Sequence, residues 1–227
     1  MQKVAFFDID GTVFRSSLLI ELVETCIEDG IFPQDTQEHY KKEFTAWQHR
    51  EGTYEAYIDA VVKTFMEYIR GVHYGAFAEI GRKVVLKEGK KTYRYTRDLI
   101  EDLKGKGYYL VAISQSPKTI LDEFCASYGF DKVYGRIYEI GPRDLFTGVV
   151  TDEDFIKNKA LVVDRVLERQ GLNREGSIGV GDTEGDIPLL ESVDMPICFN
   201  PNMKLFEYAK GKKWPVIVER KDVVYTI

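Results

Sequence analysis

Three short apolar runs in this chain each end at a polar residue, and the stretches between them have the period of amphipathic helices. The runs are residues 4–7 before Asp8, 108–113 before Ser114, and 177–180 before Gly181 and Asp182. Apolar strands that alternate with helices predict a buried parallel sheet, and such sheets bind ligands beyond the carboxyl ends of their strands. The pattern therefore predicts a doubly wound α/β fold whose polar residues meet at one edge.

Asp8 and Asp10 flank Ile9 where the first run ends, directly before Gly11 and Thr12. Alternate residues of a strand share a face, so the two carboxylates are expected side by side. Like charges at this spacing are costly unless a cation lies between them or one of them holds a proton. A bound metal, a nucleophilic carboxylate and a neighbour that exchanges a proton would each meet that requirement.

Composition narrows the class of protein. With 227 residues, 44% of them hydrophobic and 30% charged, the chain can bury one core or a core plus a small second domain. The net charge of −6 argues against a nucleic-acid partner, which usually requires a basic surface. It does not exclude phosphorylated substrates, because a bound dication and a few local cations can dominate a site. The sequence does not separate a monomer from a homodimer.

The cysteines and the chain start bear on location. Cys26, Cys125 and Cys198 lie far apart in apolar surroundings and predict small buried hydrophobes, not a disulfide framework or a zinc site. The N-terminus enters a strand without a charged-then-apolar signal segment, and no apolar run approaches the ~20 residues that span a bilayer. We therefore expect a cytoplasmic protein without a membrane partner.

Four amphipathic helical patterns follow the first strand, and capping signals open three of them. These signals are Ser16 or Ser17, the capping box Asp35-x-x-Glu38 after Pro33, and Gly52-Thr53; the fourth pattern covers about residues 74–87. The patterns predict a small helical bundle over residues 16–88.

The chain thus divides into a core of residues 1–15 and 89–227 and an inserted helical cap of residues 16–88. We expect the cap to move about hinges near residues 12–16 and 88–92. Within the core, the turn signals after Ile140 predict a β-hairpin over residues 136–150, near the edge of the sheet.

The order of the motifs resembles that of the haloacid dehalogenase (HAD) superfamily of phosphohydrolases. The motifs are Asp-x-Asp-Gly-Thr at 8–12, the strand that ends in Ser114, a lone lysine best matched by Lys159, and Gly-Asp-x-x-x-Asp at 181–186. The long helical stretch between Asp8 and Ser114 is similar to the phosphoserine-phosphatase-like branch, in which a helical cap follows the first strand. The resemblance implies a HAD-like Rossmannoid core with that cap.

The resemblance also implies roles for the first motif. Asp8 would attack phosphorus and form an aspartyl phosphate, and Asp10 would act as general acid and then as general base. Superfamily members that remove halogens lack the second Asp, so Asp10 favours phosphoryl chemistry. Thr12 is expected to brace the turn and to orient Asp10. Mg²⁺ is the implied cofactor, held by Asp8, the carbonyl oxygen of Asp10 and Asp182.

Further residues complete the implied site. Asp186 would act on the metal through water or orient its ligands, although a carboxylate there also suits a helix N-terminus. Ser114 would bind a phosphoryl oxygen, although alone it would be an ordinary helix N-cap. Lys159 would neutralise the crowded negative charge, with Lys157 as the alternative. Gly11, Thr12 and Gln115 are the remaining members of the implied phosphate-binding set.

The cap offers two groups of candidate substrate contacts. Its aromatic residues have helical spacing, so packing of the bundle is the stronger interpretation and a substrate platform the weaker one. These residues are Tyr40, Phe44, Trp47, Tyr54, Tyr57, Phe65 and Tyr68. The charged candidates are Arg15, His49, Arg50, Arg70 and His73.

Several positions depart from the pattern of phosphoserine phosphatases. Ser17 stands where the family has a Glu that holds the substrate ammonium, and Asp59 lies nearest the place of the Arg that holds the serine carboxylate. Gly185 replaces an Asn, and Gln115 and Ser116 replace two glycines. The catalytic set is complete while the serine-recognition set is not.

The sequence therefore predicts a Mg²⁺-dependent phosphatase for a small phosphorylated metabolite other than phosphoserine. Two other functions stay open. One is a phosphotransferase, in which the same aspartyl phosphate passes to an alcohol or sugar. The other is a non-catalytic phosphate-binding regulatory protein.

Overall fold

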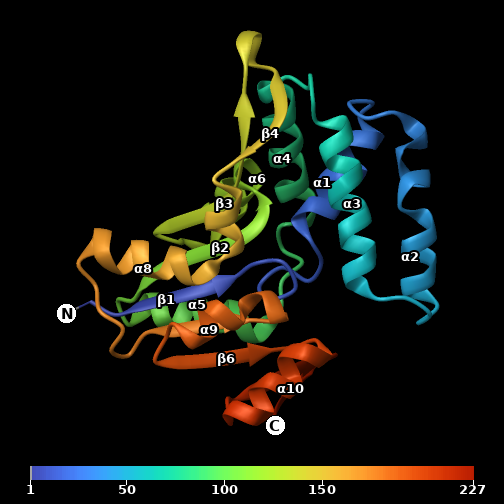
Figure 1. Ribbon diagram of the computed structural model, residues 1–227. Helices are drawn as coiled ribbons and strands as arrows, with labels where there is room; N and C mark the ends of the chain where they lie inside the picture. Colours follow the sequence, from blue (N-terminus) through green and yellow to red (C-terminus); the bar gives the residue numbers. More distant parts are fainter. Residues whose placement is uncertain (1) are drawn as a thin grey trace.

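The computed structural model describes residues 2–227 and shows one mixed sheet with helices on both faces (Figure 1). The strands are β1 (Val4–Asp8), β2 (Tyr109–Pro117), β3 (Lys132–Ile140), β4 (Phe146–Thr151), β5 (Ile178–Gly181), β6 (Met195–Phe199), β7 (Val216–Arg220) and β8 (Val223–Thr226). Their order is β4-β3-β2-β1-β5-β6-β7-β8. All neighbours are parallel except the outermost pairs, β3–β4 and β7–β8, which are antiparallel. The predicted doubly wound α/β fold is confirmed.

Strand β1 explains why the sheet is covered on both faces. Its five residues are all buried, and alternate side chains enter different apolar clusters. Ala5 and Phe7 pack on the side of α5 (Arg94–Gly105) and α6 (Lys118–Tyr128). Val4 and Phe6 pack against α8 (Lys159–Gln170) and α9 (Ile187–Glu191) on the other side. The remaining core helices are α7 (Glu153–Lys157) and α10 (Met203–Lys212).

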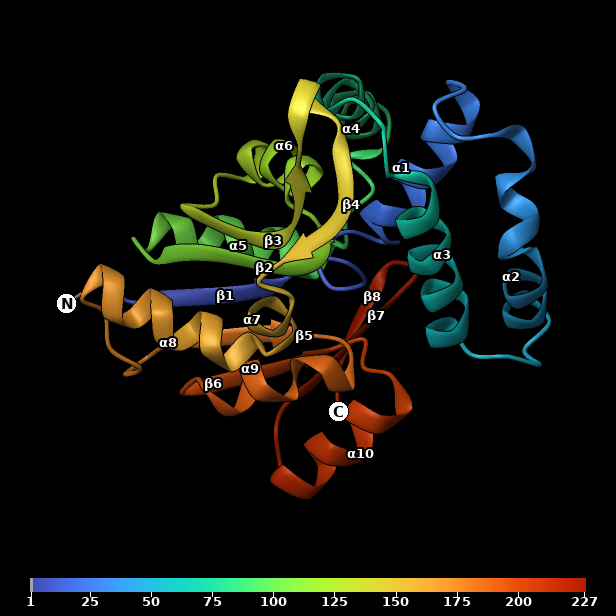
Figure 2. The same cartoon turned by 45° about the horizontal axis from the view of Figure 1, so that its top comes forward.

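The insert after β1 is helical, as predicted, and lies beyond the carboxyl end of that strand (Figures 1 and 2). Its elements are α1 (Leu18–Glu28), a 3₁₀ helix (Gln34–His39), α2 (Lys41–Gln48), α3 (Tyr54–Tyr68) and α4 (Tyr74–Glu88). Ser17 caps α1 by accepting a hydrogen bond from Leu19 N, and Thr53 caps α3 through Ala56 N. In both views α2 is the cap helix that lies farthest from the sheet.

The capping box expected at Asp35 and Glu38 is wrong. Residues 34–39 form the 3₁₀ helix without a side-chain cap, and α2 begins only at Lys41. The side chain of Tyr40 is buried, and its hydroxyl donates to Glu24 Oε1 of α1 at 2.6 Å. This hydrogen bond to α1 fixes the position of Tyr40, whose backbone angles of φ −126° and ψ 1° are not helical. The chain is therefore interrupted at Tyr40, and the capping signal at Asp35 does not begin one continuous helix.

The predicted hairpin is formed by β3 and β4, and it reaches the cap. The segment between α3 and α4 pairs with it, because Gly71 N donates to Phe146 O at 2.8 Å and Phe146 N donates to Val72 O at 2.9 Å. The Phe146 ring also meets Phe77 of α4 edge to face, with centroids 5.2 Å apart. The cap helices thus share one apolar cluster with the hairpin and α6. The division at residues 16–88 stays a prediction.

Among the helices of residues 2–227, none combines the length and the apolar character that crossing a membrane would require.

Candidate active site

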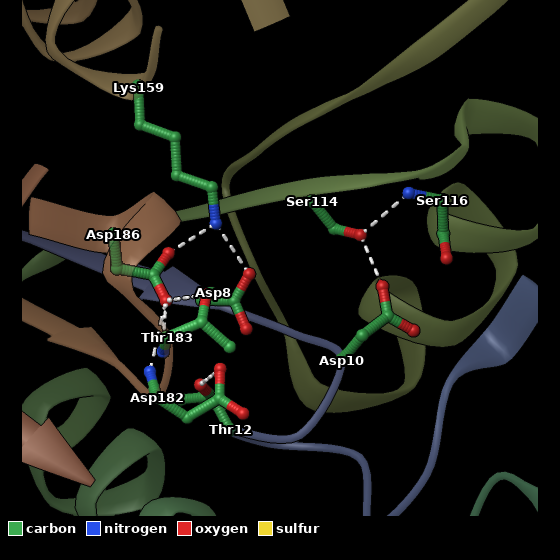
Figure 3. Close-up of polar contacts among 9 residues, drawn as sticks. All are labelled: Asp8, Asp10, Thr12, Ser114, Ser116, Lys159, Asp182, Thr183 and Asp186. Carbon is green, nitrogen blue, oxygen red and sulfur yellow. Dashed lines mark hydrogen bonds and ion pairs between the residues drawn. The ribbon is translucent and has the colours of Figure 1, made fainter. Parts of the chain in front are cut away.

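Asp8 at the end of β1, Ser114 in β2 and Asp182 after β5 meet at the carboxyl ends of these strands (Figure 3). The expectation that the second strand ends at Ser114 is wrong, because β2 continues to Pro117. β1 lies between the other two strands, and Asp8 is in register with Ile113, the residue before Ser114. Asp182 follows the last residue of β5 directly. Parallel pairing of the strands thus brings together side chains that are far apart in the sequence.

Lys159 is at the centre of the cluster. Its Nζ lies 2.6 Å from Asp8 Oδ1 and 2.5 Å from Asp186 Oδ1, and all three side chains are at least nine-tenths buried. Burial opposes the charge of Lys159, but Asp186 and Asp8 together raise its pKa above the usual value. Lys157 instead pairs with the half-exposed Glu153 at 3.0 Å, outside the cluster. Of the two lysines, the structure places Lys159 at the site.

Asp186 positions both the lysine and the loop after β5. Its Oδ1 binds Lys159, and its Oδ2 accepts hydrogen bonds from Asp182 N and Thr183 N, both at 3.0 Å. Its backbone N–H and Thr183 complete a capping box at the 3₁₀ helix Glu184–Asp186. Gly181 leaves room for the carboxylate, because a Cβ there would collide with it. Asp186, to which the sequence assigned the orienting role, therefore has both carboxylate oxygens hydrogen-bonded within the protein.

Asp182 is oriented by the turn after β1. Thr12 Oγ1 donates to Asp182 Oδ1 at 3.2 Å, and Gly11, with φ of +84°, leaves space for the same carboxylate. The expectation that Thr12 orients Asp10 is wrong, because the turn directs its hydroxyl to the neighbouring strand end. Burial, together with the charges of Asp8 and Asp186, raises the pKa of Asp182 well above its ordinary value.

The cluster has the donor set of a hard cation. Asp8, Asp182 and Asp186 each offer a carboxylate oxygen, and these oxygens lie within 4.8 Å of one another. Asp8 Oδ2 is buried and has no hydrogen-bond partner within residues 2–227. Burial, with the charges of Asp186 and Asp10 and against that of Lys159, raises the pKa of Asp8 to about 7. Three carboxylates around one ammonium fit an oxygen-liganded divalent cation such as Mg²⁺.

Asp10 and Ser114 form a second, smaller network beside this cluster. Asp10 Oδ1 accepts from Leu18 N, the first amide of α1, at 2.6 Å. Its Oδ2 accepts from Ser114 Oγ, which itself accepts from Ser116 N at 2.9 Å. The sequence expected Ser114 to face a phosphoryl oxygen, and here its hydroxyl donates to Asp10. The amide of Leu18 thus anchors the Asp10 side chain at the N-terminus of α1.

Both networks open into a pocket of about 230 Å³ between the core and α3. Its core wall contains Asp8, Asp10, Ser114, Gln115, Ser116, Arg136, Lys159, Asp182, Thr183 and Gly185, and its other wall contains Ser17, Leu19, Tyr54, Ile58, Asp59 and Val62. All five positions that depart from the phosphoserine phosphatase pattern therefore line the pocket. Gly11 and Thr12 contribute through Asp182 instead of lining it.

The cap residues singled out from the sequence are placed unequally. Tyr54 alone among the cap aromatics lines the pocket, while Tyr40, Tyr57 and Phe65 are buried in the apolar cluster. None of the charged candidates lines it. His49 and Arg50 follow α2, Arg70 packs beside Gly148, His73 caps α4, and Arg15 lies over the ring of Tyr93 at 5.6 Å. The helical spacing showed which cap residues lie on the same side of a helix, but it did not show whether that side contacts the apolar cluster or the pocket.

Sequence reasoning missed Arg136, which is 6% exposed and lines the pocket. It lies on β3 in register with Pro117 of β2, and its Nη2 donates to Gln115 Oε1 at 2.7 Å. The available signal in the sequence was a single arginine within the predicted strand that neighbours the one carrying Ser114. Ile58 and Val62 were also missed, because α3 had been interpreted through its aromatic residues.

Residues 5–191 match the family model of haloacid dehalogenase-like hydrolases. The chain belongs to this family. Its sequence is 24% identical to a phosphoserine phosphatase of Archaeoglobus fulgidus over 92% of this chain, although it spans only 56% of that relative. It is 23% identical to a histidinol-phosphatase of Neisseria meningitidis serogroup C over 96% of this chain and 99% of the relative.

The fold of this HAD hydrolase is also that of a solved phosphoserine phosphatase, described as a phospho-aspartyl intermediate analogue. The two superpose with a TM-score of 0.63 at 19% identity, over 97% of this chain and 95% of the other. The chain thus belongs to the haloacid dehalogenase-like hydrolases and has the fold of the phosphoserine-phosphatase-like branch.

Proposed function

We propose that this HAD hydrolase is a Mg²⁺-dependent phosphatase that hydrolyses small phosphate monoesters through an aspartyl phosphate on Asp8. One observation carries the proposal: Asp8 Oδ2 is buried and unpartnered, while Lys159 fixes the other oxygen at 2.6 Å. An anchored carboxylate with one free oxygen at the pocket is suited to attack an electrophile held there.

In the first step, Asp8 Oδ2 forms a bond to phosphorus and the bond from phosphorus to the leaving oxygen breaks. Asp10, on the pocket wall beside Asp8, gives that oxygen a proton. In the second step, Asp10 takes a proton from water, the water oxygen attacks the phosphorus of the aspartyl phosphate, and Asp8 leaves as a carboxylate. Each proton that Asp10 gives is thus recovered, and inorganic phosphate is released.

The surrounding residues support these steps. Lys159 offsets the repulsion between the phosphoryl group and the carboxylates, and Ser114 is one hydrogen bond from Asp10. Asp8, Asp182 and the carbonyl oxygen of Asp10 would hold Mg²⁺, with Asp186 orienting them. When bound, the ion supplies positive charge that draws the phosphoryl oxygens toward Asp8.

The substrate is proposed to be a small phosphorylated metabolite other than phosphoserine. Ser17 is engaged in capping α1, and it is too short to replace a Glu as a partner for a substrate ammonium. Asp59 brings a negative charge to the pocket near the place where the family has an Arg for the serine carboxylate. The relatives named for phosphoserine and for histidinol phosphate support a small phosphomonoester without choosing between these substrates.

A phosphate-release assay on a panel of phosphomonoesters tests the proposal. Release should need Mg²⁺ and stop in excess chelator, and Ca²⁺ should inhibit because its larger, looser coordination misplaces the nucleophile. Full activity in chelator would contradict the metal requirement. Added alcohols would reveal a phosphotransferase if phosphoryl product formed faster than inorganic phosphate. No turnover of any ester with Mg²⁺ would favour the regulatory alternative.

A further inference from the structure

Arg136 is a buried cation whose donors are only partly paired, although the Tyr138 hydroxyl lies beside its guanidinium. A guanidinium carries five N–H donors, and burying it without hydrogen bonds or a counter-charge is costly. Here Nη2 donates to Gln115 Oε1 at 2.7 Å, while Nε is buried with no partner. Glu153 Oε1 is 3.9 Å from Nη2 and is itself bound by Lys157 at 3.0 Å. The protein therefore leaves much of the binding capacity of Arg136 unused.

This capacity lies at the pocket but apart from the proposed site of reaction. Arg136 lines the pocket on β3, two strands from β1. In residues 2–227 no hydrogen bond or ion pair joins it to Asp8, Asp10 or Lys159. Gln115, the residue after Ser114, holds its Nη2. A group bound by Arg136 would thus belong to the leaving group of the substrate and not to the phosphoryl group on Asp8.

The rest of the pocket lining leaves Arg136 as the cation available to a leaving group. The other lining cation, Lys159, is already bound to Asp8 and Asp186. Helix α3 contributes Asp59, whose charge repels an anion near the cap and favours its placement toward β3.

We propose that Arg136 is a specificity residue that binds a carboxylate on the leaving group of the phosphomonoester substrate. The planar guanidinium suits a carboxylate, which can accept from two of its N–H donors at once. This inference rests on the proposed phosphatase function. It places the anion-binding group on the core wall, whereas the pattern of phosphoserine phosphatases expects it on the cap.

Two matched substrate pairs test the inference with the wild-type protein. Phosphoserine carries a carboxylate that phosphoethanolamine lacks, and 3-phosphoglycerate has a carboxylate where glycerol 3-phosphate has a hydroxymethyl group; an ammonium is present only in the first pair. The acid should be preferred in both pairs, by about tenfold or more in kcat/KM, since each adds a charged hydrogen-bonded contact. A ratio of one or less in both pairs would overturn the inference.

Arg136→Met removes the guanidinium and keeps a flexible apolar side chain. It should lower the acid-to-neutral ratio on the order of 10²-fold, chiefly through KM, because the carboxylate loses its charged partner. Arg136→Lys should retain part of the ratio. Arg143→Met is the matched control, since Arg143 is an exposed arginine at the tip of the same hairpin.

Equal losses on all substrates in Arg136→Met would overturn the inference and assign Arg136 to holding Gln115 in place. If that variant does not fold, the wild-type ratios and Arg136→Lys decide the question. If the proposed phosphatase function itself is wrong, no phosphate will be released from any of the esters. Failure of the Arg136 inference alone would appear as release without preference for the acids.

Discussion

On the core wall of the pocket, Asp8 and Lys159 are buried and paired with each other, and Lys159 also pairs with the buried Asp186, whereas on the cap wall Tyr54 and Asp59 are exposed. Asp8 ends β1, which parallel pairing holds in register with its neighbours, and Lys159 is the first residue of α8. The cap residues share one face of α3. An exposed ion pair between Glu55 of α3 and Lys204 of α10, at 3.4 Å, joins this helix to the core.

The difference shows how the two walls divide the work. Charges act most strongly where water is excluded and where the groups need not reorganise, and the core wall meets both conditions. Besides Asp59, the cap wall has Ser17 and Tyr54 as polar residues and is otherwise apolar, and it can change without disturbing the carboxylates. Arg136 is the exception, because it joins the burial of the core wall to the proposed selection of substrate. We therefore expect core substitutions to affect all substrates and α3 substitutions to affect their ranking.

Asp8→Asn should have the largest effect. It should lower turnover roughly 10⁴-fold or more, because the nucleophile is lost while its geometry is kept. Removing one of three clustered carboxylates should leave the thermal unfolding midpoint of the metal-free protein unchanged or higher. Phosphate release and a thermal melt measure both effects, and trapping with beryllium fluoride should fail in the variant. Asp35→Asn, an exposed control in the 3₁₀ helix, should keep activity. A wild-type rate in Asp8→Asn would exclude Asp8 as the nucleophile.

Asp182→Ala should depress every substrate together, by at least on the order of 10²-fold, since it removes a proposed metal ligand. The same variant should need more Mg²⁺ for half-maximal activity. A titration with Mg²⁺ on two unrelated esters measures this. An effect confined to one of the esters would contradict the assignment of Asp182 to the shared chemistry.

Ile58→Ala on the cap wall should instead alter the ranking of substrates, by roughly tenfold between esters of different size, because it removes pocket surface. A small generic ester should respond least. Ile31→Ala is a suitable control, since Ile31 is a cap isoleucine that does not line the pocket. Uniform loss on all esters would show that α3 positions the core chemistry and would break the proposed division between the walls.

Mg²⁺ should stabilise the protein more at pH 8 than at pH 5.5. In the metal-free protein the pKa of Asp8 rises from 3.8 to about 7, so the folded state holds a proton that the unfolded state has lost between these values. The stability contributed by that proton is present at low pH and is lost as the pH rises through 7. Mg²⁺ must displace the proton, so the shift in the melting midpoint should grow with pH. A shift of equal size at both pH values would contradict this.

Lys204→Ala should have the smallest effect. Its ion pairs with Glu184 and Glu55 join α10 to the cap, but all three charges face solvent to some extent. Exposed pairs contribute less than about 1 kcal/mol, so stability should barely change. If the pairs help to close the cap, the salt dependence of KM should weaken in the variant. A large fall in the melting midpoint would show that this contact holds the cap in place.

The hinge prediction also needs one structural adjustment. The hairpin is hydrogen-bonded to the segment between α3 and α4 through Gly71 and Val72, so these parts are tied to the edge of the sheet. We therefore expect any opening to carry the hairpin along or to be limited to α2 and the start of α3. Both kinds of opening keep these hydrogen bonds, so the amides of Gly71 and Phe146 should exchange equally slowly with and without beryllium fluoride, and faster exchange in the free protein would contradict the adjustment.

Much of the fold could be predicted because its signals are local. The apolar runs before Asp8, Ser114 and Asp182 were sufficient to predict parallel strands, and Ser17 and Thr53 cap helices as their residue types suggest. Where a tertiary contact competes with a local signal, the prediction fails. Tyr40 binds Glu24 across two helices, and the capping box expected at Asp35 does not form.

The sequence by itself determined which chemical groups this protein has and which strand ends carry them, since hydrophobic periodicity and strand polarity are properties of short segments. Only the tertiary structure decided which groups meet. It placed Lys159 and not Lys157 beside Asp8, turned the Thr12 hydroxyl to Asp182, and buried Arg136 on the pocket wall. The physical reason is that hydrogen bonds and ion pairs extend only a few ångströms, so partners distant in sequence are set by packing of the strands and helices that carry them.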